Sequence, residues 1–496
     1  MSDIRYVCMS DLHFGADTSV LTSLGPDGKT PDPSKANKVL VQMVECLKSV
    51  VGQNESDRKP TLILNGDILE LALTTTNVAA MTFERFLELI FPKGERPLFD
   101  NKIFFLPGNH DHHLWESARE TQYLKHIRSL GPVLPIPWHG TNMLVEHDTN
   151  QLPSRFLTTL IQRYPGRSGI FVACAYPNFA VRAKGGNRCV IFHHGHFVER
   201  IYHLMSILKT HLIPNSQKPK DIFEIEAENF AWIDFFWSAL GRSGQVGKDV
   251  DMIYTKLQNP DALKKLIQKA ILKNMAGAIR DFKTRKEVET VIETPFVGPR
   301  AEKLIDLAIE RIIEEIVGAI VDKMIGRERR QPTDFGPALE KGLREYVEEP
   351  LHRQFADEYK RVHNAKPPRD LTFVFGHTHK PFERRIKFKN YGNTPVGVYN
   401  TGGWVVDSEQ TEEVHGGAIL LFDEDLNAAS LRMYNERKAL KDYVVEVHAL
   451  TDNPLKKRIR KLVGDGKAGP WAKFSKTLGK DVRERRKLIR HKIQRS

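Results

Sequence analysis

Five short apolar segments of this chain each end at a cluster of aspartate, asparagine or histidine residues. The segments are Ile4–Met9, Thr61–Leu64, Ile103–Leu106, Cys189–Phe192 and Leu371–Phe375, and the clusters are residues 10–13, 65–67, 107–111, 193–196 and 376–379. Short apolar runs that end at turn residues are typical of buried β-strands. Because open α/β sheets bind ligands outside the carboxyl ends of their strands, five strand ends can bring these clusters together.

The clusters combine carboxylate oxygens, imidazole nitrogens and one asparagine carbonyl, with no thiolate among them. Such a mixed set suits manganese, iron or zinc at a catalytic centre and argues against a closed structural zinc site. Asp11 and His13 are two residues apart, as are His377 and His379, so in extended backbone each pair points to one side. Two metals about 3.5–4 Å apart can clamp a phosphate and activate a bridging water for in-line attack.

The order of the motifs resembles the calcineurin-like metallophosphoesterase superfamily. The series is Asp-x-His, Gly-Asp, Gly-Asn-His-Asp, His-Gly-His and Gly-His-Thr-His, each after an apolar run. The resemblance covers residues 4–200 and about 370–430. It implies an α/β fold with a two-sheet β-sandwich core flanked by helices, and a hydrolase that acts on phosphoester or phosphoric anhydride bonds.

The resemblance also implies a role for each motif residue. It predicts one metal bound by Asp11, His13 and His379, a second bound by Asn109, His194 and His377, and a bridging carboxylate from Asp67. Both metals are expected to be divalent, with Mn²⁺ first and Fe, Zn or a mixed pair as alternatives. His110 is expected to act as general acid on the leaving oxygen or to orient the scissile phosphate, and Asp111 to orient His110.

Four further histidines lie in the clusters or directly after one, and have no assigned ligand role. His193 and His194 are adjacent, so their spacing leaves the ligand open, and the family's placement of the ligand before glycine favours His194. His193 and His196 are then expected to contact the ligand residues and not the metals, with His196 facing substrate as the alternative. His112 and His113 are expected behind the ligands or at the surface.

The residues around the motifs bear on the substrate. Ile68-Leu69-Glu70 follows Asp67, where protein phosphatases of the superfamily usually have Asp-Arg-Gly, so a protein phosphatase is disfavoured. The strings at 66–70 and 376–381 are similar to bacterial UDP-2,3-diacylglucosamine pyrophosphohydrolases, which hydrolyse a lipid-linked pyrophosphate at the membrane surface. That family usually has Arg at the place of His110 and Asp at the place of His196, and its chains are shorter.

These patterns lead to one main hypothesis and two alternatives. The main hypothesis is a hydrolase with a metal-bridging hydroxide that acts on a lipid- or nucleotide-linked phosphodiester or pyrophosphate. The first alternative is a nuclease or nucleotide phosphodiesterase. The second is a scaffold that uses the same fold to bind a partner without catalysis.

The order of the elements divides the chain into three expected parts. These are a discontinuous core at 1–200 and 366–440, a mainly helical insertion at 201–365 and a basic C-terminal tail at 441–496. Helices are expected at 38–51, 77–92 and 115–128, and later strands at 384–389, 397–400, 417–422 and 431–435. Alternating strands and helices are typical of an α/β fold.

The expected insertion contains two notable segments. Residues 301–326 carry apolar side chains at helical spacing, and residues 229–240 are rich in aromatic side chains. One interpretation is a helical cap with a core of its own. The alternative is a lid over the metal centre, with an apolar slot for an acyl chain.

Composition indicates a globular protein of the cytoplasm. Of the 496 residues 41% are hydrophobic and 27% are charged, and no apolar run is long enough for a membrane span. The first expected strand begins at residue 4, which leaves no room for a signal peptide. Four cysteines without CxxC spacing suit reduced thiols.

The net charge of +12 is confined to the end of the chain. Residues 451–496 contain 16 Lys/Arg and 4 Asp/Glu, and the rest of the chain balances at 58 of each. Such a tail predicts an anionic membrane surface or nucleic acid as partner, or else a solvated, partly disordered end. Trp471 and Phe474 among the lysines favour a peripheral membrane location over nucleic acid.

Overall fold

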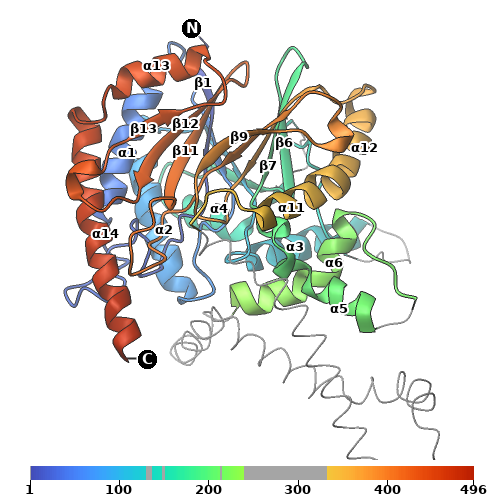
Figure 1. Ribbon diagram of the computed structural model, residues 1–496, viewed down its shortest axis with the longest axis horizontal. Coiled ribbons are helices and arrows are strands. Elements are labelled where there is room, and N and C mark those ends of the chain that lie inside the picture. The colour runs from blue at the N-terminus through green and yellow to red at the C-terminus, as the bar shows by residue number, and fades with distance from the viewer. Residues whose placement is uncertain (1, 130–136, 148–150, 213–214, 240–331, 496) are drawn as a thin grey trace, which may run out of the picture.

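Two β-sheets form the centre of the molecule (Figure 1). The computed structural model describes residues 2–129, 137–147, 151–212, 215–239 and 332–495. The larger sheet has eight strands in the order β13-β12-β11-β1-β2-β3-β5-β4, and the smaller has five in the order β6-β7-β8-β10-β9. The predicted α/β fold with a two-sheet core is confirmed.

In the larger sheet, the strands that precede the first three motifs are parallel neighbours. Its strands are β1 (Ile4–Met9), β2 (Thr61–Leu64), β3 (Lys102–Phe105), β4 (Leu152–Pro153), β5 (Phe171–Cys174), β11 (Gly416–Asp423), β12 (Ala428–Asn435) and β13 (Glu446–His448). β1, β2, β3 and β5 run parallel, while β11 is antiparallel to β1. The carboxyl ends of β1, β2 and β3 therefore meet at one edge.

The smaller sheet brings the last two motifs together in the same way. Its strands are β6 (Asn178–Arg182), β7 (Arg188–His193), β8 (Asp370–Phe375), β9 (Phe382–Ile386) and β10 (Val396–Asn400). β7 and β8 are parallel although about 180 residues separate them, with Phe192 opposite Val374. Their carboxyl ends lie side by side.

The inner faces of the two sheets pack against each other through one apolar cluster. Cys8, Ile63 and Phe104 from the larger sheet and Phe192 and Val374 from the smaller belong to it, and all are buried. Alternation along each strand directs these side chains inward and leaves the intervening ones for the helices. The sandwich places the motif ends of both sheets at a common edge.

Helices cover the outer face of each sheet. α1 (Lys38–Val51), α2 (Thr76–Ile90), α3 (His113–Ser129) and α4 (Arg155–Gln162) belong with the larger sheet, and α11 (Pro337–Tyr346), η6 (Val347–Leu351) and α12 (His352–His363) with the smaller. The α1 bounds are those predicted, because Asn37 caps its start by accepting a hydrogen bond from Val39 N, and its apolar stripe is buried.

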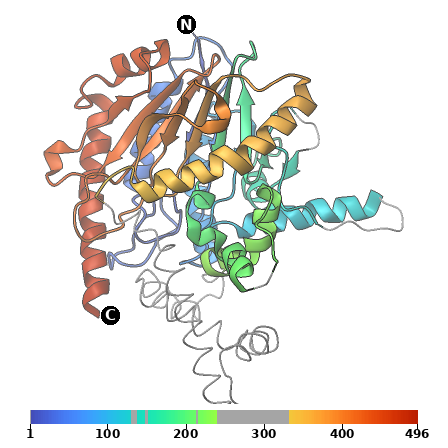
Figure 2. The same cartoon turned by 45° about the vertical axis from the view of Figure 1, so that its right-hand side comes forward.

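α11 and α12 belong to the expected insertion, yet they cover the smaller sheet. Figure 2 shows them crossing the molecule as one rod. Tyr346 donates a hydrogen bond to Asn178 Oδ1 in β6, and Gln354 of α12 accepts one from Asn178 Nδ2. The core boundary expected at residue 366 thus places α11 and α12 outside the core, although they pack on its smaller sheet. The domain boundaries stay a prediction, and the helix predicted at 301–326 lies outside the described residues.

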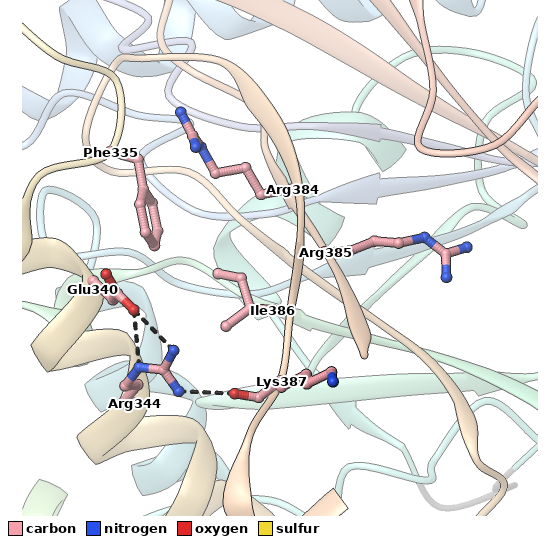
Figure 3. A pocket seen from close by; sticks show the side chains of 7 residues that line it. All are labelled: Phe335, Glu340, Arg344, Arg384, Arg385, Ile386 and Lys387. Carbon is pink, nitrogen blue, oxygen red and sulfur yellow. Dashed lines mark hydrogen bonds and ion pairs between the residues drawn. The ribbon is translucent and has the colours of Figure 1, made fainter. Parts of the chain in front are cut away.

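A shallow depression of about 350 Å³ lies between α11 and the edge strand β9 (Figure 3). Arg344 of α11 joins the two sides of the depression, since the guanidinium donates hydrogen bonds to Glu340 Oε1 on α11 and to Lys387 O after β9. Arg384 of β9 pairs with Asp334 at 3.0 Å. Charged side chains and a covering helix protect the exposed edge of the smaller sheet.

Short helices continue from the fourth motif and fill the space beside the strand ends. They are η1 (His196–Val198), η2 (Arg200–His203), α5 (Leu204–Leu212), α6 (Ile222–Ile233) and the π-helical turn η3 (Asp234–Ala239), while η7 (Lys389–Tyr391) and η8 (Leu440–Asp442) lie elsewhere. No helix among the described residues has both the length and the apolar composition of a bilayer crossing. All four cysteines are buried free thiols.

The basic end of the chain forms two helices that pack on the body, α13 (Pro454–Val463) and α14 (Gly469–Arg495). α14 lies against α1 along the outer edge of the molecule (Figure 1). Trp471 is 3% exposed and Phe474 0%, and the Phe474 ring lies 6.5 Å from that of Trp404. The expectation that these two rings sit at a membrane interface is wrong, because burying them in the core stabilises the fold more than solvent exposure would.

Arg485 anchors α14 by a buried polar contact. Its guanidinium is 0% exposed and donates to Asp17 O at 2.6 Å, to Thr22 O, and to Asp481 Oδ2 at 3.0 Å. Each guanidinium nitrogen therefore has an acceptor, which makes burial of the charge tolerable, whereas loss of the arginine leaves its acceptors without that donor.

Replacement of Arg485 by alanine should therefore lower the free energy of unfolding by about 3 kcal/mol, since the Asp17 carbonyl and Asp481 Oδ2 lose their donor. Arg483→Ala is the matched control, because that arginine is exposed on the same helix. Urea denaturation followed by circular dichroism gives both values. Equal stability of the two variants would contradict a structural role for α14.

Candidate metal centre

The five motif clusters converge at the common edge of the sandwich. Possible ligand atoms of Asp11, His13 and His379 lie within 4.8 Å of one another, and so do those of Asp67, His194 and His377. All six side chains are buried. The two groups are those the resemblance implied for the two metals, with Asn109 beside the second group.

Left-handed backbone, and not extended strand, directs several of these side chains. The φ angles are +51° at Asp11, +45° at His13, +50° at Asp67, +70° at His377 and +57° at His379. Non-glycine residues rarely adopt this conformation, and it is tolerated where the surroundings hold it in place, commonly at functional sites. The expectation that Asp11 and His13 share a direction through extended geometry is thus wrong, because both follow the strand in a tight turn.

Two glycines allow the clusters to approach closely. A Cβ at Gly66 would lie 2.4 Å from His194 Nδ1, and one at Gly108 would lie 2.3 Å from Asp67 Oδ1. Both distances are far below van der Waals contact. Gly66 also has φ of +86°, which L side chains rarely adopt. A side chain at either position would displace a candidate ligand.

Hydrogen bonds fix the orientation of three candidate ligand imidazoles. His13 Nδ1 donates to Glu70 Oε2 at 2.9 Å, His379 Nδ1 to Asp407 Oδ2 at 2.7 Å, and His194 Nδ1 to Asn65 O at 3.2 Å. A neutral imidazole that donates from Nδ1 carries its lone pair on Nε2. Nε2 is therefore the atom that each could offer to a metal, as is usual where a carboxylate or carbonyl orients a metal-binding histidine.

His377 is turned the other way. Its Nε2 lies 3.4 Å from Glu199 Oε2, and its backbone N–H donates to the Asp11 carboxylate at 3.0 Å. The Glu199 carboxylate is the acceptor that faces Nε2, which leaves Nδ1 for the second group. His377 thus links the two ligand groups through its backbone.

The ligand atoms fit divalent cations, because only acceptors face one another here once the imidazoles are neutral. His194 Nε2 is 3.1 Å from Asn109 Oδ1 and 3.3 Å from Asp67 Oδ2. His13 Nε2 and Asp67 Oδ2 are 3.7 Å apart, and neither has a hydrogen-bond partner among the described residues. Buried acceptors without a donor are costly, and a cation between them removes that cost.

Charges across the centre favour bound cations. Burial acts to lower the pKa of His194, but the Asp67 and Asp11 carboxylates raise it to about 9. Burial acts to raise the pKa of the Asp67 carboxyl, but His194, His110 and His13 hold it well below its usual range. The centre thus attracts positive charge, and metal binding at His194 must displace a proton.

Glu70 is the functional residue that sequence reasoning missed. It is buried, and its second oxygen, Oε1, accepts a hydrogen bond from His110 Nδ1 at 2.9 Å. Glu70 therefore orients both a candidate ligand and the candidate general acid. Its place in the Gly-Asp-Ile-Leu-Glu string, three residues after Asp67, is the sequence signal that marks it. Asp407 and Glu199 carried no such signal.

Asp111 has a different role from the one expected. Its carboxylate accepts backbone hydrogen bonds from Gly108 N and Ile68 N, both at 2.7 Å, and from Leu69 N at 3.2 Å. It therefore ties the turn after β3 to the turn after β2. The expectation that Asp111 orients His110 is corrected, because Glu70 faces the His110 imidazole.

The remaining motif histidines lie behind the ligands. The His193 ring centroid is 4.6 Å from that of Tyr346, and His196 Nε2 is 3.1 Å from Tyr176 Oη. His112 is fully buried and lies 3.0 Å from Glu226 Oε1, while His113 is partly exposed. His193 thus packs towards the helical cover, and His194 is the member of the pair that faces the metal centre.

Comparison with known families agrees with the geometry. The calcineurin-like phosphoesterase model matches residues 4–236, which contain the first four motifs. Residues 4–236 are thus similar to the calcineurin-like phosphoesterases, and this similarity supports a metal-dependent phosphoester hydrolase. No curated protein matches the chain significantly. The fifth motif lies beyond the match, and the structure brings it to the same centre through the pairing of β8 with β7.

Replacement of Glu70 by glutamine should weaken metal binding about 10- to 100-fold, because an amide holds His13 in the ligand orientation less well than a carboxylate. Titration of the metal-free protein with Mn²⁺, followed by calorimetry, measures the change. Glu95→Gln, on the exposed surface, is the control. Unchanged affinity in the Glu70 variant would show that its hydrogen bonds do not support the ligands.

Proposed function

We propose that this protein hydrolyses a phosphoester at a two-metal centre. The proposed ligands are Asp11, His13, Asp67, Asn109, His194, His377 and His379. The observation that carries the proposal is the buried group of acceptors around Asp67, which face one another across distances that suit cations. Two metals bound there would supply Lewis-acid activation of the phosphate and of the attacking water. Mn²⁺ is the first candidate, with Fe, Zn or a mixed pair as alternatives.

His110 is the proposed general acid. Its Nδ1 donates to Glu70, so Nε2 is the atom that gives a proton to the leaving oxygen. Burial acts to raise the pKa of Glu70, but His110 and His13 lower it to about 2, so this carboxylate stays ionised. An ionised carboxylate behind the ring stabilises the imidazolium form, which is the form that donates a proton.

The same contacts favour an alkoxide as leaving group. An alkoxide is a poor leaving group unless a proton reaches it during bond cleavage, and His110 is placed to provide one. Phosphodiesters and phosphomonoesters of alcohols are therefore the proposed substrate class, ahead of anhydrides. The acyl-chain slot of the lipid hypothesis falls largely on residues outside the described part, so lipid-linked substrates remain a prediction.

The Asp67→Ala variant should bind neither metal tightly and should lose activity, because one carboxylate serves both ligand groups. The assay is hydrolysis of bis-p-nitrophenyl phosphate and p-nitrophenyl phosphate by the Mn²⁺-loaded protein, with metal content measured in parallel. Wild-type protein that holds two metals and cleaves neither compound would favour the scaffold alternative. Near-normal turnover by the variant would refute the ligand assignment.

His110→Ala should keep both metals and slow turnover by about 10²–10⁴, the usual contribution of general acid catalysis. The loss should be smaller for nitrophenolate, which leaves without protonation, than for an alkyl leaving group. Measurement of kcat for methyl p-nitrophenyl phosphate and for a dialkyl phosphate separates the two cases. An equal loss for both would indicate that His110 positions the phosphate instead.

A further inference from the structure

The outer face of α14 carries a single line of cations, here called the basic stripe. Its members recur every three or four residues: Lys473, Lys476, Lys480, Arg483, Lys487 and Arg490. All six are exposed. At 1.5 Å per residue the stripe extends about 26 Å along one face of the helix.

The packing of α14 fixes the direction of this stripe. Trp471, Phe474, Leu478 and Val482 are buried on the opposite face, and Arg485 is held by carbonyls of the loop after β1. The helix cannot rotate to hide its cations without exposing these groups. Figures 1 and 2 show α14 at the outer edge of the molecule, from the end near α13 to the C-terminus.

Repulsion between the cations of the basic stripe destabilises the protein when no partner is bound. Like charges three or four residues apart on a helix repel, and all lie within a screening length of their neighbours. Lys487 pairs with Glu484 and Arg490 with Glu409. The side chains of Lys473, Lys476, Lys480 and Arg483 have no ion pair within the described part of the chain. An anionic partner would relieve this repulsion.

The structure favours a linear polyanion over a membrane. A helix that binds a membrane inserts an apolar face, but the apolar face of α14 is already buried in the core. No exposed position of α14 holds an apolar residue among those the structure describes. The stripe is also a ridge one residue wide, which matches a line of phosphates better than a plane of headgroups. We infer that the basic stripe of α14 docks the phosphate backbone of a nucleic acid.

One end of the stripe reaches the loops beside the metal centre. Arg490 pairs at 2.7 Å with Glu409, two residues beyond Asp407, which orients His379. A strand docked along α14 would therefore lie close to these loops. Docking does not depend on turnover at the metal centre, so it can be tested independently of the proposed hydrolysis.

The test uses the full chain and a fluorescein-labelled 30-nucleotide single-stranded DNA, with binding followed by anisotropy as KCl rises. Each neutralised phosphate contributes about −0.7 to the slope of log K against log salt on single strands, so six contacts predict about −4. The variant Lys473→Gln/Lys476→Gln/Lys480→Gln/Arg483→Gln should lose about tenfold or more in affinity, and its slope should fall by about 3.

A matched variant controls for net charge. It removes four exposed cations elsewhere: Lys93→Gln, Lys184→Gln, Lys366→Gln and Arg369→Gln. This control should keep the wild-type affinity and slope within a factor of about two. Thermal unfolding of both variants checks the fold, and hydrolysis of bis-p-nitrophenyl phosphate should be equal in both, since none of these residues lies at the metal centre.

Several results would overturn the inference. Equal losses in the two variants would mean that net charge, and not the stripe, attracts DNA. The absence of wild-type binding at 50 mM KCl would exclude nucleic acid. Stripe-dependent binding to phosphatidylglycerol vesicles without DNA binding would assign the surface to a membrane. None of these results depends on the metal centre, so failure of docking and failure of the proposed hydrolysis are distinguishable.

Discussion

The approach of Asp67 to His194 is the contact on which the centre depends, because it joins the two sheets. Asp67 follows β2 of the larger sheet and His194 follows β7 of the smaller, and their side chains lie 3.3 Å apart in the protein interior. Gly66 and Gly108 leave no room for a side chain between them. Sandwich packing and tight turns thus have one consequence, a buried cluster of carboxylates and imidazoles that could hold cations.

Hydrogen bonds to the imidazole rings fix which nitrogen of each histidine faces the centre. A carboxylate or a carbonyl faces one nitrogen of each candidate ligand histidine, which leaves the other nitrogen for the centre. Glu70 is special because it contacts both His13 and His110. A change at Glu70 would therefore alter metal binding and proton donation together, whereas Asp407 and Glu199 act on single ligands.

The C-terminal helices use their two faces for different purposes. The inner face of α14 completes the core through Trp471 and Phe474, while Arg485 joins it to the loop after β1. The outer face keeps the excess positive charge of the chain in solvent. Trp471 and Phe474 were the reason to place a membrane ahead of nucleic acid as partner, and their burial removes that reason.

The sequence by itself determined the strand ends, the first helix and the motif clusters that the structure brings together, because apolar runs and motif spacing are local patterns. The position directly before Gly195 also favoured His194 over His193 as the candidate ligand. Tertiary structure alone decided that Glu70 and not Asp111 supports His110, that α11 and α12 cover the smaller sheet, and which face of α14 meets solvent. Each of these depends on contacts between residues far apart in the chain, which local patterns do not encode. The left-handed turn at Asp11 likewise depends on its surroundings and not on the local pattern.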